Sequence, residues 1–237
     1  SRGYSGHATR ALAYSLGTQT PPDLQQSYAM GPIDPPPADA VGTPAEAAFF
    51  HPNFWPQDQP ALRAAFEAYY RSMEGLATEV LRMFALALGL PERHFDTTCD
   101  RHTSTMRAIL YAAQTEPPAP GQLRAGVHSD YGTLTILRGD DVPGGLQVKL
   151  RHGDWVDVHP APDSFVCNIG DLMQRWTNDR WTSNLHRVAN PPPEFAGIER
   201  VSVPFFHNPN FDAEIRCLDR EAGARYEPVV FGEFFLG

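Results

Sequence analysis

The sequence predicts a mainly β protein, an antiparallel sandwich or barrel with flanking helices and one long helix in front of it. Two patterns of apolar residues indicate this class: a period of three to four residues over positions 60–90, and a period of two beyond position 111. Turns rich in Gly, Asp and Pro separate the alternating segments, with few helices between them. This order favours antiparallel strands over a parallel sheet with crossover helices.

The composition is that of a globular protein with a negative surface. Of the 237 residues, 42% are hydrophobic and 20% are charged, and 19 basic against 28 acidic side chains give a formal charge of −9. This charge disfavours nucleic acids and anionic membranes as partners, because both require a positive surface. No apolar run approaches the ~20 residues that span a bilayer, no secretory signal is evident, and three scattered cysteines form no disulfide or metal pattern. We therefore expect a cytoplasmic protein.

The first part of the chain, residues 1–59, is expected to be irregular. Ten of the 23 prolines fall between Pro21 and Pro60, where they prevent a continuous helix or a central strand. Four aromatic residues lie near the end of this stretch: Phe49, Phe50, Phe54 and Trp55. These aromatics favour a loop pinned to the surface, and a mobile lid over a site is the alternative.

A long scaffold helix is predicted over residues 60–90. Its apolar positions recur every three or four residues: Leu62, Phe66, Tyr69, Met73, Leu76, Val80, Phe84 and Leu88. Pro60 suits the first turn of a helix, and Gly89 suits the position just past its end. The apolar positions form one face, which we assign to core packing.

Short strands are predicted in the β core, residues 105–237. The alternating segments are 133–137, 146–148, 155–158, 165–169 and 201–203. Turns such as 139–145 and 151–154 separate them. We expect the helical and β parts to pack as one domain over residues 1–237.

Histidine and carboxylate residues carry the candidate chemistry, because the common motifs of hydrolases, zinc proteases and nucleotide-binding loops do not occur. The pattern His-x-Asp occurs three times: His94/Asp96, His128/Asp130 and His152/Asp154. Only His128 and Asp130 lead into an alternating strand, where residues i and i+2 point to the same face. We therefore select this pair as metal ligands, with His186, at the start of another short strand, as the third.

Two imidazoles and one carboxylate on one side of an ion leave the opposite positions open. This ligand set is typical of non-heme Fe(II) oxygenases, and zinc is chemically possible too. From these residues alone, a hydrogen-bonded surface pair of His128 and Asp130 with a separately buried His186 explains the pattern equally well.

The only Arg-x-Ser of the chain, Arg200 and Ser202, lies in a strand-like segment beyond His186. Residues i and i+2 of a strand share a face, so the guanidinium and the hydroxyl can bind one carboxylate together. A carboxylate site close downstream of a metal triad favours the oxygenase interpretation over the structural one.

These residues resemble the Fe(II)/2-oxoglutarate-dependent oxygenases, in the branch similar to isopenicillin N synthase. The similar motifs follow the family's order: Gly3-Tyr4, Pro21-Pro22-Asp23-Leu24, His128-Ser129-Asp130-Tyr131-Gly132, Gly144-Gly145-Leu146-Gln147-Val148, Asn168-Ile169-Gly170-Asp171, His186-Arg187-Val188 and Arg200-Val201-Ser202-Val203-Pro204-Phe205-Phe206. The resemblance covers nearly the whole chain. It implies a distorted double-stranded β-helix, or jelly roll.

The resemblance also implies cofactors and roles. The iron ligands that it implies are His128, Asp130 and His186. The cosubstrate 2-oxoglutarate would be bound through its distal carboxylate by Arg200 and Ser202, with support from Tyr111. With O₂, such an enzyme oxidises, most often hydroxylates, a small organic substrate and releases succinate and CO₂.

Two departures from the family accompany this resemblance. Family members usually begin some tens of residues before the position of Ser1, so we expect early strands of the main sheet to be missing. In plant members an asparagine stands two positions before the tyrosine that Tyr111 resembles. This chain has Ile109 there, which weakens the support expected for 2-oxoglutarate.

Three other functions remain open from the sequence. One is an oxidase similar to isopenicillin N synthase that uses no 2-oxoglutarate, in which Arg200 and Ser202 bind a carboxylate of the substrate itself. Another is a non-catalytic jelly-roll binding module with a vestigial metal site. A zinc hydrolase is less favoured, because no glutamate or third histidine stands out as a general base.

We expect a monomer that acts on a small-molecule substrate. Leu146 and whichever of Phe205 and Phe206 faces inward are candidates to line the apolar side of the pocket. Arg107, four residues before Tyr111, either meets an anionic substrate or forms an external salt bridge.

Overall fold

The computed structural model describes residues 2–36, 41–140, 142, 145–218 and 223–236. Part of the turn expected at 139–145, including Gly144 of one family-like motif, lies outside these ranges. Among the described residues, no helix is both long and apolar enough to cross a membrane.

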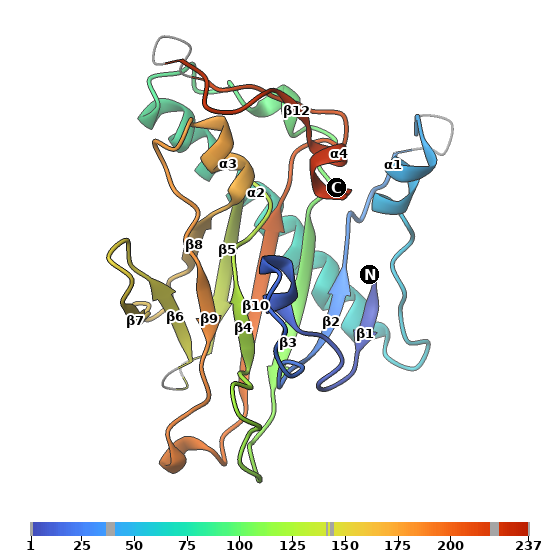
Figure 1. Cartoon of the computed structure of the whole chain (residues 1–237). Helices are drawn as coiled ribbons and strands as arrows, with labels where there is room; N and C mark the ends of the chain where they lie inside the picture. The colour runs from blue at the N-terminus through green and yellow to red at the C-terminus, as the bar shows by residue number, and fades with distance from the viewer. Residues whose placement is uncertain (1, 37–40, 141, 143–144, 219–222, 237) are drawn as a thin grey trace.

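Two antiparallel sheets form the body of the described chain (Figure 1). The larger sheet has the order β1-β2-β3-β10-β5-β8, with β1 at Gly3–Ser5, β2 at Gln26–Met30, β3 at Thr105–Tyr111, β10 at Arg200–His207, β5 at Leu134–Gly139 and β8 at Val166–Ile169. The smaller sheet has the order β4-β9-β6-β7, with β4 at Ala125–His128, β9 at His186–Val188, β6 at Leu146–Lys149 and β7 at Trp155–Asp157. The antiparallel pairing confirms the mainly β class.

Each segment predicted to alternate contains a strand. The largest difference is β10, which spans Arg200–His207. The alternating segment was 201–203, within a longer strand-like stretch that contains Arg200. Proline donates no ladder hydrogen bond and is unusual in a central strand. Pro204 is nevertheless accommodated between β3 and β5, opposite Leu137.

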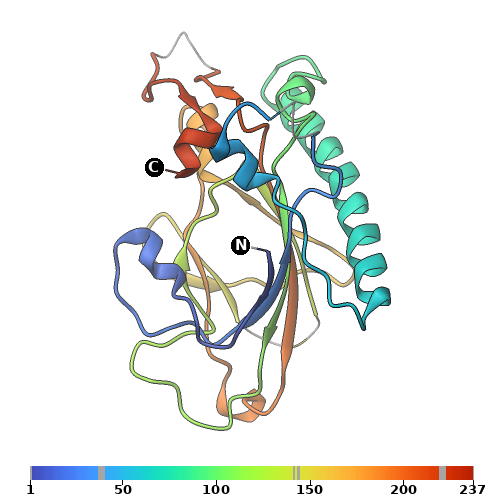
Figure 2. The ribbon, with the colours of Figure 1, turned by 90° about the vertical axis from the view of Figure 1, so that its right-hand side faces the viewer.

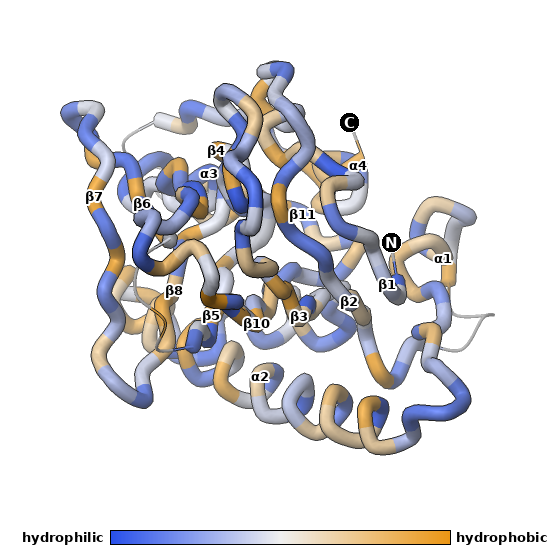
Figure 3. The backbone as a smooth tube through the Cα atoms, turned by 90° about the horizontal axis from the view of Figure 1, so that it is seen from below, coloured by the Kyte–Doolittle hydropathy of each residue, from blue (hydrophilic) through white to orange (hydrophobic). Residues whose placement is uncertain are grey.

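Helix α2 (Pro60–Ala87) lies along the outer face of the larger sheet, as two views show (Figures 1 and 2). Its fully buried residues include Tyr70, Met73 and Ala77, and they share one core with Ile136 of β5 and Phe205 of β10. Hydrophobic and hydrophilic stretches alternate along the helix beside the sheet (Figure 3). The predicted scaffold helix and its packing role are confirmed.

The N-terminal segment 1–59 was expected to be irregular, and this was wrong for two strands, a 3-10 helix and a short α-helix of the described chain. Strand β2 pairs with β1 on one side and with β3 on the other. The prolines lie on either side of β2, and the strand depends on pairing with a distant segment that no local pattern reveals. The 3-10 helix spans Leu12–Leu16, and the short helix α1 spans Pro44–Phe49.

Helix α1 follows local rules that the proline count concealed. Its first residue is Pro44, which suits the first turn of a helix. The Thr43 hydroxyl accepts a hydrogen bond from the backbone N–H of Glu46, and the Glu46 carboxylate accepts one from the N–H of Gly42. The first bond is the usual N-cap bond of a helix start, and the second is made one residue before the N-cap Thr43.

The aromatic anchors of this segment are confirmed except at Phe54. Trp55 stacks on Tyr28 of β2, Phe49 packs edge-on against Phe211, and Phe50 is buried. Phe54 is 57% exposed.

The remaining elements close one end of the sheets (Figure 1). They are α3 (Asp171–Trp176), the small pair β11 (Glu214–Ile215) and β12 (Val229–Val230), and α4 (Phe231–Leu236). Short 3-10 helices occur at Leu12–Leu16, Asp96–Thr98 and Pro193–Phe195.

Candidate active site

A cavity of about 460 Å³ is lined by residues of both sheets. The alternation of side chains along β10 divides its residues between this cavity and the core: Arg200, Ser202 and Phe206 line the cavity, whereas Phe205 packs against α2. Strand β3 follows the same rule, with Arg107 and Tyr111 in the cavity. Period-two geometry therefore gathers the polar residues of both strands on one face.

The three predicted metal ligands lie together in this cavity. His128 ends β4 and His186 begins β9, and the two residues are direct partners in the antiparallel register. Their ring centres are 4.3 Å apart, and Nε2 of His186 lies 3.8 Å from Oδ1 of Asp130. One ligand atom from each of the three residues lies within 4.8 Å of the others, so they form the candidate iron site.

The prediction that one strand carries both His128 and Asp130 was wrong. Strand β4 ends at His128, and Asp130 lies in the turn before β5. Asp130 is held there by its backbone, because its C=O accepts a 2.7 Å hydrogen bond from the N–H of Asp171 at the start of α3. The Ser129 hydroxyl also donates to the Asp171 carboxylate.

Both imidazoles are oriented by backbone carbonyl groups. Nδ1 of His128 lies 2.7 Å from the Gly126 oxygen, and Nδ1 of His186 lies 3.1 Å from the Asn184 oxygen. Since a carbonyl oxygen only accepts, each Nδ1 carries the proton, and Nε2 is left with its lone pair for a metal.

Burial keeps the imidazole of His128 neutral. It lowers the pKa of His128 to about 4, with the nearby His186 as the second cause. Neutral imidazole is the form that binds metals.

Asp130 provides the test of whether this site fits an ion. Its side chain is buried, and Oδ2 has no hydrogen-bond partner among the described residues. A buried carboxylate oxygen without a partner is unfavourable unless a cation lies beside it. Two imidazole nitrogens and this carboxylate match the facial set of non-heme Fe(II) proteins.

Arg200, Ser202 and Tyr111 form a second polar group in the cavity. All three side chains are buried, and Tyr111 lies opposite Arg200 in the pairing of β3 with β10. Burial raises the pKa of the Tyr111 hydroxyl, against the opposing effects of Ser202 and Arg200, so this hydroxyl stays protonated. Nε of Arg200 is buried without a hydrogen-bond partner in the described chain, and Asp140 lies 3.9 Å away.

Arg124 belongs to the same group and was not predicted. Its side chain is 1% exposed and donates to the backbone oxygens of Ala112 and Ile198, and its guanidinium carbon lies 6.0 Å from the Tyr111 ring centre. No local pattern pointed to Arg124, because the register of β4 shifts between Ala125 and His128.

Two glycines let α3 approach the metal site. A Cβ on Gly170 would lie 1.9 Å from the backbone oxygen of Gly132, and a Cβ on Gly132 would lie 2.3 Å from the oxygen of His207. Backbones therefore meet here without side chains between them. This contact places the start of α3 where it binds the backbone of Asp130.

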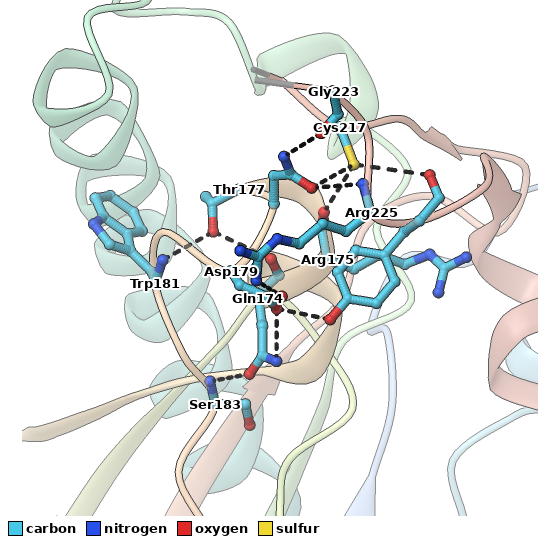
Figure 4. Close-up of polar contacts among 11 residues, drawn as sticks. Gln174, Arg175, Thr177, Asp179, Trp181, Ser183, Cys217, Gly223 and Arg225 are labelled. Carbon is cyan, nitrogen blue, oxygen red and sulfur yellow. Dashed lines mark hydrogen bonds and ion pairs between the residues drawn. The ribbon is translucent and has the colours of Figure 1, made fainter. Parts of the chain in front are cut away.

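A polar network that begins at Gln174 in α3 holds the segment that leads to His186 (Figure 4). Gln174 accepts a 2.6 Å hydrogen bond from the N–H of Ser183 and donates to Asp179. The Thr177 hydroxyl accepts from the N–H of Trp181. The network fixes the chain just before Asn184, whose carbonyl orients His186.

The other two His-x-Asp pairs lie outside the cavity. His152 and Asp154 form an exposed ion pair of 3.1 Å in a turn. Asp96 binds Arg82, and the ring of His94 packs against Phe95. Phe206 and Leu146 line the cavity, so Phe206 is the inward-facing phenylalanine.

Comparison with known proteins identifies similar sequences. A family model described as the 2OG-Fe(II) oxygenase superfamily matches residues 102–209. Homoarginine-6-hydroxylase 2-ODD-233 of Oryza sativa subsp. japonica is 35% identical over 228 residues, which cover 92% of this chain and 67% of that protein. Validamycin A dioxygenase of Streptomyces hygroscopicus subsp. limoneus is 33% identical over 239 residues, which cover 99% of this chain and 64% of that protein. The chain thus spans about two thirds of the length of these relatives.

Solved structures give the same result. Full-length Neurospora crassa T7H in complex with alpha-KG matches with a TM-score of 0.83 and 31% identity, covering 99% of this chain and 74% of that chain. The dioxygenase for auxin oxidation (DAO) in rice matches with a TM-score of 0.68 and 28% identity, covering 92% of this chain and 69% of that chain. These likenesses confirm the jelly-roll fold.

Proposed function

Because the chain belongs to the 2OG-Fe(II) oxygenase superfamily, we propose that it couples the oxidative decarboxylation of 2-oxoglutarate to the oxidation, most often hydroxylation, of a small organic substrate. The observation that carries this proposal is the partnerless oxygen of Asp130 close to two imidazoles, in a cavity that is also lined by Arg200 and Ser202. The binding-module and zinc-hydrolase alternatives have no specific observation in their favour.

His128, Asp130 and His186 hold the Fe(II) in this proposal. When bound, the iron supplies the activation of O₂, with 2-oxoglutarate as the source of electrons. The task of the protein is to present two neutral imidazoles and one carboxylate on the same side. The carbonyl groups of Gly126 and Asn184 and the N–H of Asp171 fix that presentation.

Arg200 and Ser202 bind the distal carboxylate of 2-oxoglutarate, and the Tyr111 hydroxyl supports it. The guanidinium supplies charge-assisted donors, one of which has no hydrogen-bond partner in the described residues. Leu137, Leu146 and Val188 line the same cavity and exclude water from the cosubstrate.

The domain, the partner and the compartment are part of the same proposal. Residues 1–237 act as one oxygenase domain, as a monomer, on a small molecule that enters the cavity. The net charge of −9 supports a function without nucleic acid or anionic membranes. All three cysteines are free, which supports a reducing, cytoplasmic compartment.

An anaerobic titration with Fe(II) and 2-oxoglutarate tests the proposal. The complex should give a visible metal-to-ligand charge-transfer band, and Arg200→Ala should require a much higher concentration of 2-oxoglutarate to produce it. A wild-type protein without the band, or a band unchanged in Arg200→Ala, would contradict the assignment. Substrate-dependent O₂ consumption without succinate would instead support an oxidase that uses no 2-oxoglutarate.

A further inference from the structure

We infer that the substrate is an organic acid whose carboxylate is bound by Arg107, with Arg2 as a second cation. This inference rests on the proposed function and specifies the substrate class of that same site. Two observations support it: positively charged side chains line the cavity, and Arg107 and Arg2 form no ion pair with any described residue.

Arg107 extends from β3 into the cavity, on the same face as Tyr111. Its guanidinium makes no hydrogen bond or ion pair with any described residue, and its one ring contact is with Phe206, at 5.9 Å. The external salt bridge considered from the sequence does not form within the described chain. Burial lowers the pKa of Arg107, and the nearby cations Arg10 and Arg2 lower it further.

Arg2 reaches the same cavity from the N-terminal segment. One of its terminal nitrogens donates a 2.7 Å hydrogen bond to the carbonyl oxygen of Phe49, and its Nε is buried without a partner among the described residues. Gly31 makes room for it, because a Cβ there would lie 1.9 Å from the guanidinium. A hydrogen-bonded position and a matched glycine indicate that this cation is held in place at the cavity wall.

The charges on the cavity wall do not balance without an anionic substrate. Its described lining includes the cations Arg2, Arg107 and Arg200, and Asp130 is its one carboxylate. Fe(II), Asp130, Arg200 and doubly negative 2-oxoglutarate together carry no net charge. Arg107 and Arg2, which are half-buried, then remain without a counter-charge, and removing unpaired cations from water is unfavourable. A carboxylate on the substrate would neutralise one of these charges and has two oxygens that can accept hydrogen bonds from both guanidinium groups.

The surface around these arginines is aromatic. Phe49, whose carbonyl binds Arg2, packs edge-on against Phe235 at 5.3 Å, and Phe235 packs against Tyr131 at 5.7 Å. All three rings line the cavity. A substrate with an apolar body and one carboxylate would match both the rings and the cations.

Binding of matched acids and amides tests this inference without turnover. The probes are 3-phenylpropionate and octanoate against 3-phenylpropanamide and octanamide. Each is titrated calorimetrically into full-length protein that is saturated with Mn(II) and 2-oxoglutarate under anaerobic conditions, so that Arg200 is already occupied. At least one acid should bind about tenfold or more tighter than its amide, as expected for a charge-assisted contact.

The variants identify the residue responsible. Arg107→Gln should abolish the preference for the acid, Arg107→Lys should retain part of it, and the exposed control Arg63→Gln should leave it unchanged. Arg2→Gln should reduce the preference and serves as the second test if Arg107→Gln does not fold. Equal binding of acids and amides, no binding of either acid, or a preference that survives in both Arg107→Gln and Arg2→Gln would overturn the inference. The charge-transfer band of the wild-type protein tests the proposed function separately, so the two can fail independently.

Discussion

The guanidinium carbon of Arg200 lies 5.4 Å from the ring centre of Tyr111, directly across the pairing of β3 with β10. Arg124 approaches the same ring at 6.0 Å. The electron-rich face of a tyrosine stabilises cations of this kind. The ring therefore holds Arg200 in position before any carboxylate arrives, and the proposed 2-oxoglutarate site is built in advance.

Tyr111→Phe should weaken 2-oxoglutarate binding only modestly. The variant keeps the ring beside Arg200 and removes the hydroxyl near Ser202, a loss of about 0.5–1.5 kcal/mol or roughly a threefold to tenfold increase in Kd. Tyr111→Leu also removes the ring and should bind more weakly still. Titration of the charge-transfer band measures both, with the exposed Tyr4→Phe as the control. Equal affinity in Tyr111→Phe and wild type would remove the hydroxyl from the site.

Asp130→Asn should make the metal-free protein more stable and should abolish its stabilisation by metal. Without metal, the buried carboxylate of the wild type lacks a partner at Oδ2, so its replacement by a neutral amide should raise the free energy of unfolding by about 1 kcal/mol. With Mn(II), the wild type should be stabilised and the variant should not, because ligand binding to the folded state adds stability. Urea denaturation with and without Mn(II) measures both effects.

Asp154→Asn is the matched control, since that carboxylate is exposed and paired with His152. It should change neither the stability nor the response to Mn(II). Stabilisation of Asp130→Asn by Mn(II) equal to that of wild type would show that the ion binds elsewhere.

Local periodicity was sufficient to find the core strands β5, β6, β7, β8 and β10. Arg200 and Ser202 could be placed together because side chains two positions apart in a strand share a face. The helix of residues 60–87 was equally accessible, since its apolar stripe and its terminal proline and glycine are local features.

Residues positioned by distant backbone contacts could not be found in this way. Strand β2 exists because β1 and β3 pair with it, and Asp130 is held by the start of α3 rather than by its own strand. Arg2 and Arg124 lie in segments with no chemical motif, and only the closed fold brings them to the cavity and to Tyr111. The positions of β2, Asp130, Arg2 and Arg124 therefore depend on contacts between segments that are distant in the sequence.

Gly170→Ala should destabilise the protein and weaken the metal site. The added Cβ would lie 1.9 Å from the Gly132 oxygen, so the start of α3 would have to move away from the backbone of Asp130. We expect a loss of about 1–3 kcal/mol in the free energy of unfolding, as for other overpacked sites, and a weaker affinity for Mn(II). Denaturation in urea and titration with Mn(II) measure the two effects.

Gly75→Ala is the matched control, because the same substitution there should stabilise the protein. Gly75 is exposed within α2, and a Cβ there has no neighbour within 4 Å among the atoms outside its helix turn. Alanine in a helix interior is favoured over glycine by about 1 kcal/mol, so this variant should be more stable with metal affinity unchanged. A Gly170→Ala protein as stable as Gly75→Ala would contradict the close backbone contact at α3.

His207 should make the protein lose stability as the pH falls from 7 to 5. Its ring is buried, with Nδ1 2.7 Å from the Thr133 hydroxyl, and it faces His102, which pairs with Glu74. Burial, and secondarily the nearby His102, lowers the pKa of His207 to about 3. In the unfolded chain this histidine binds a proton near pH 6.5. Between these values only the unfolded state is protonated at this residue, so acid favours unfolding.

The expected size of this effect is about 2 kcal/mol between pH 7 and pH 5, obtained from the two pKa values by linkage. Urea denaturation at the two pH values measures it in wild type and in His207→Asn, which lacks the titrating group. The variant should be less stable at both pH values through the lost Thr133 contact, but its loss of stability between them should be smaller than that of wild type by about 2 kcal/mol. His152→Asn, at an exposed histidine, should lose as much as wild type. His128 titrates in every one of these proteins, so its contribution cancels in the comparison. An equal loss of stability in wild type and His207→Asn would mean that the buried imidazole takes up its proton without unfolding.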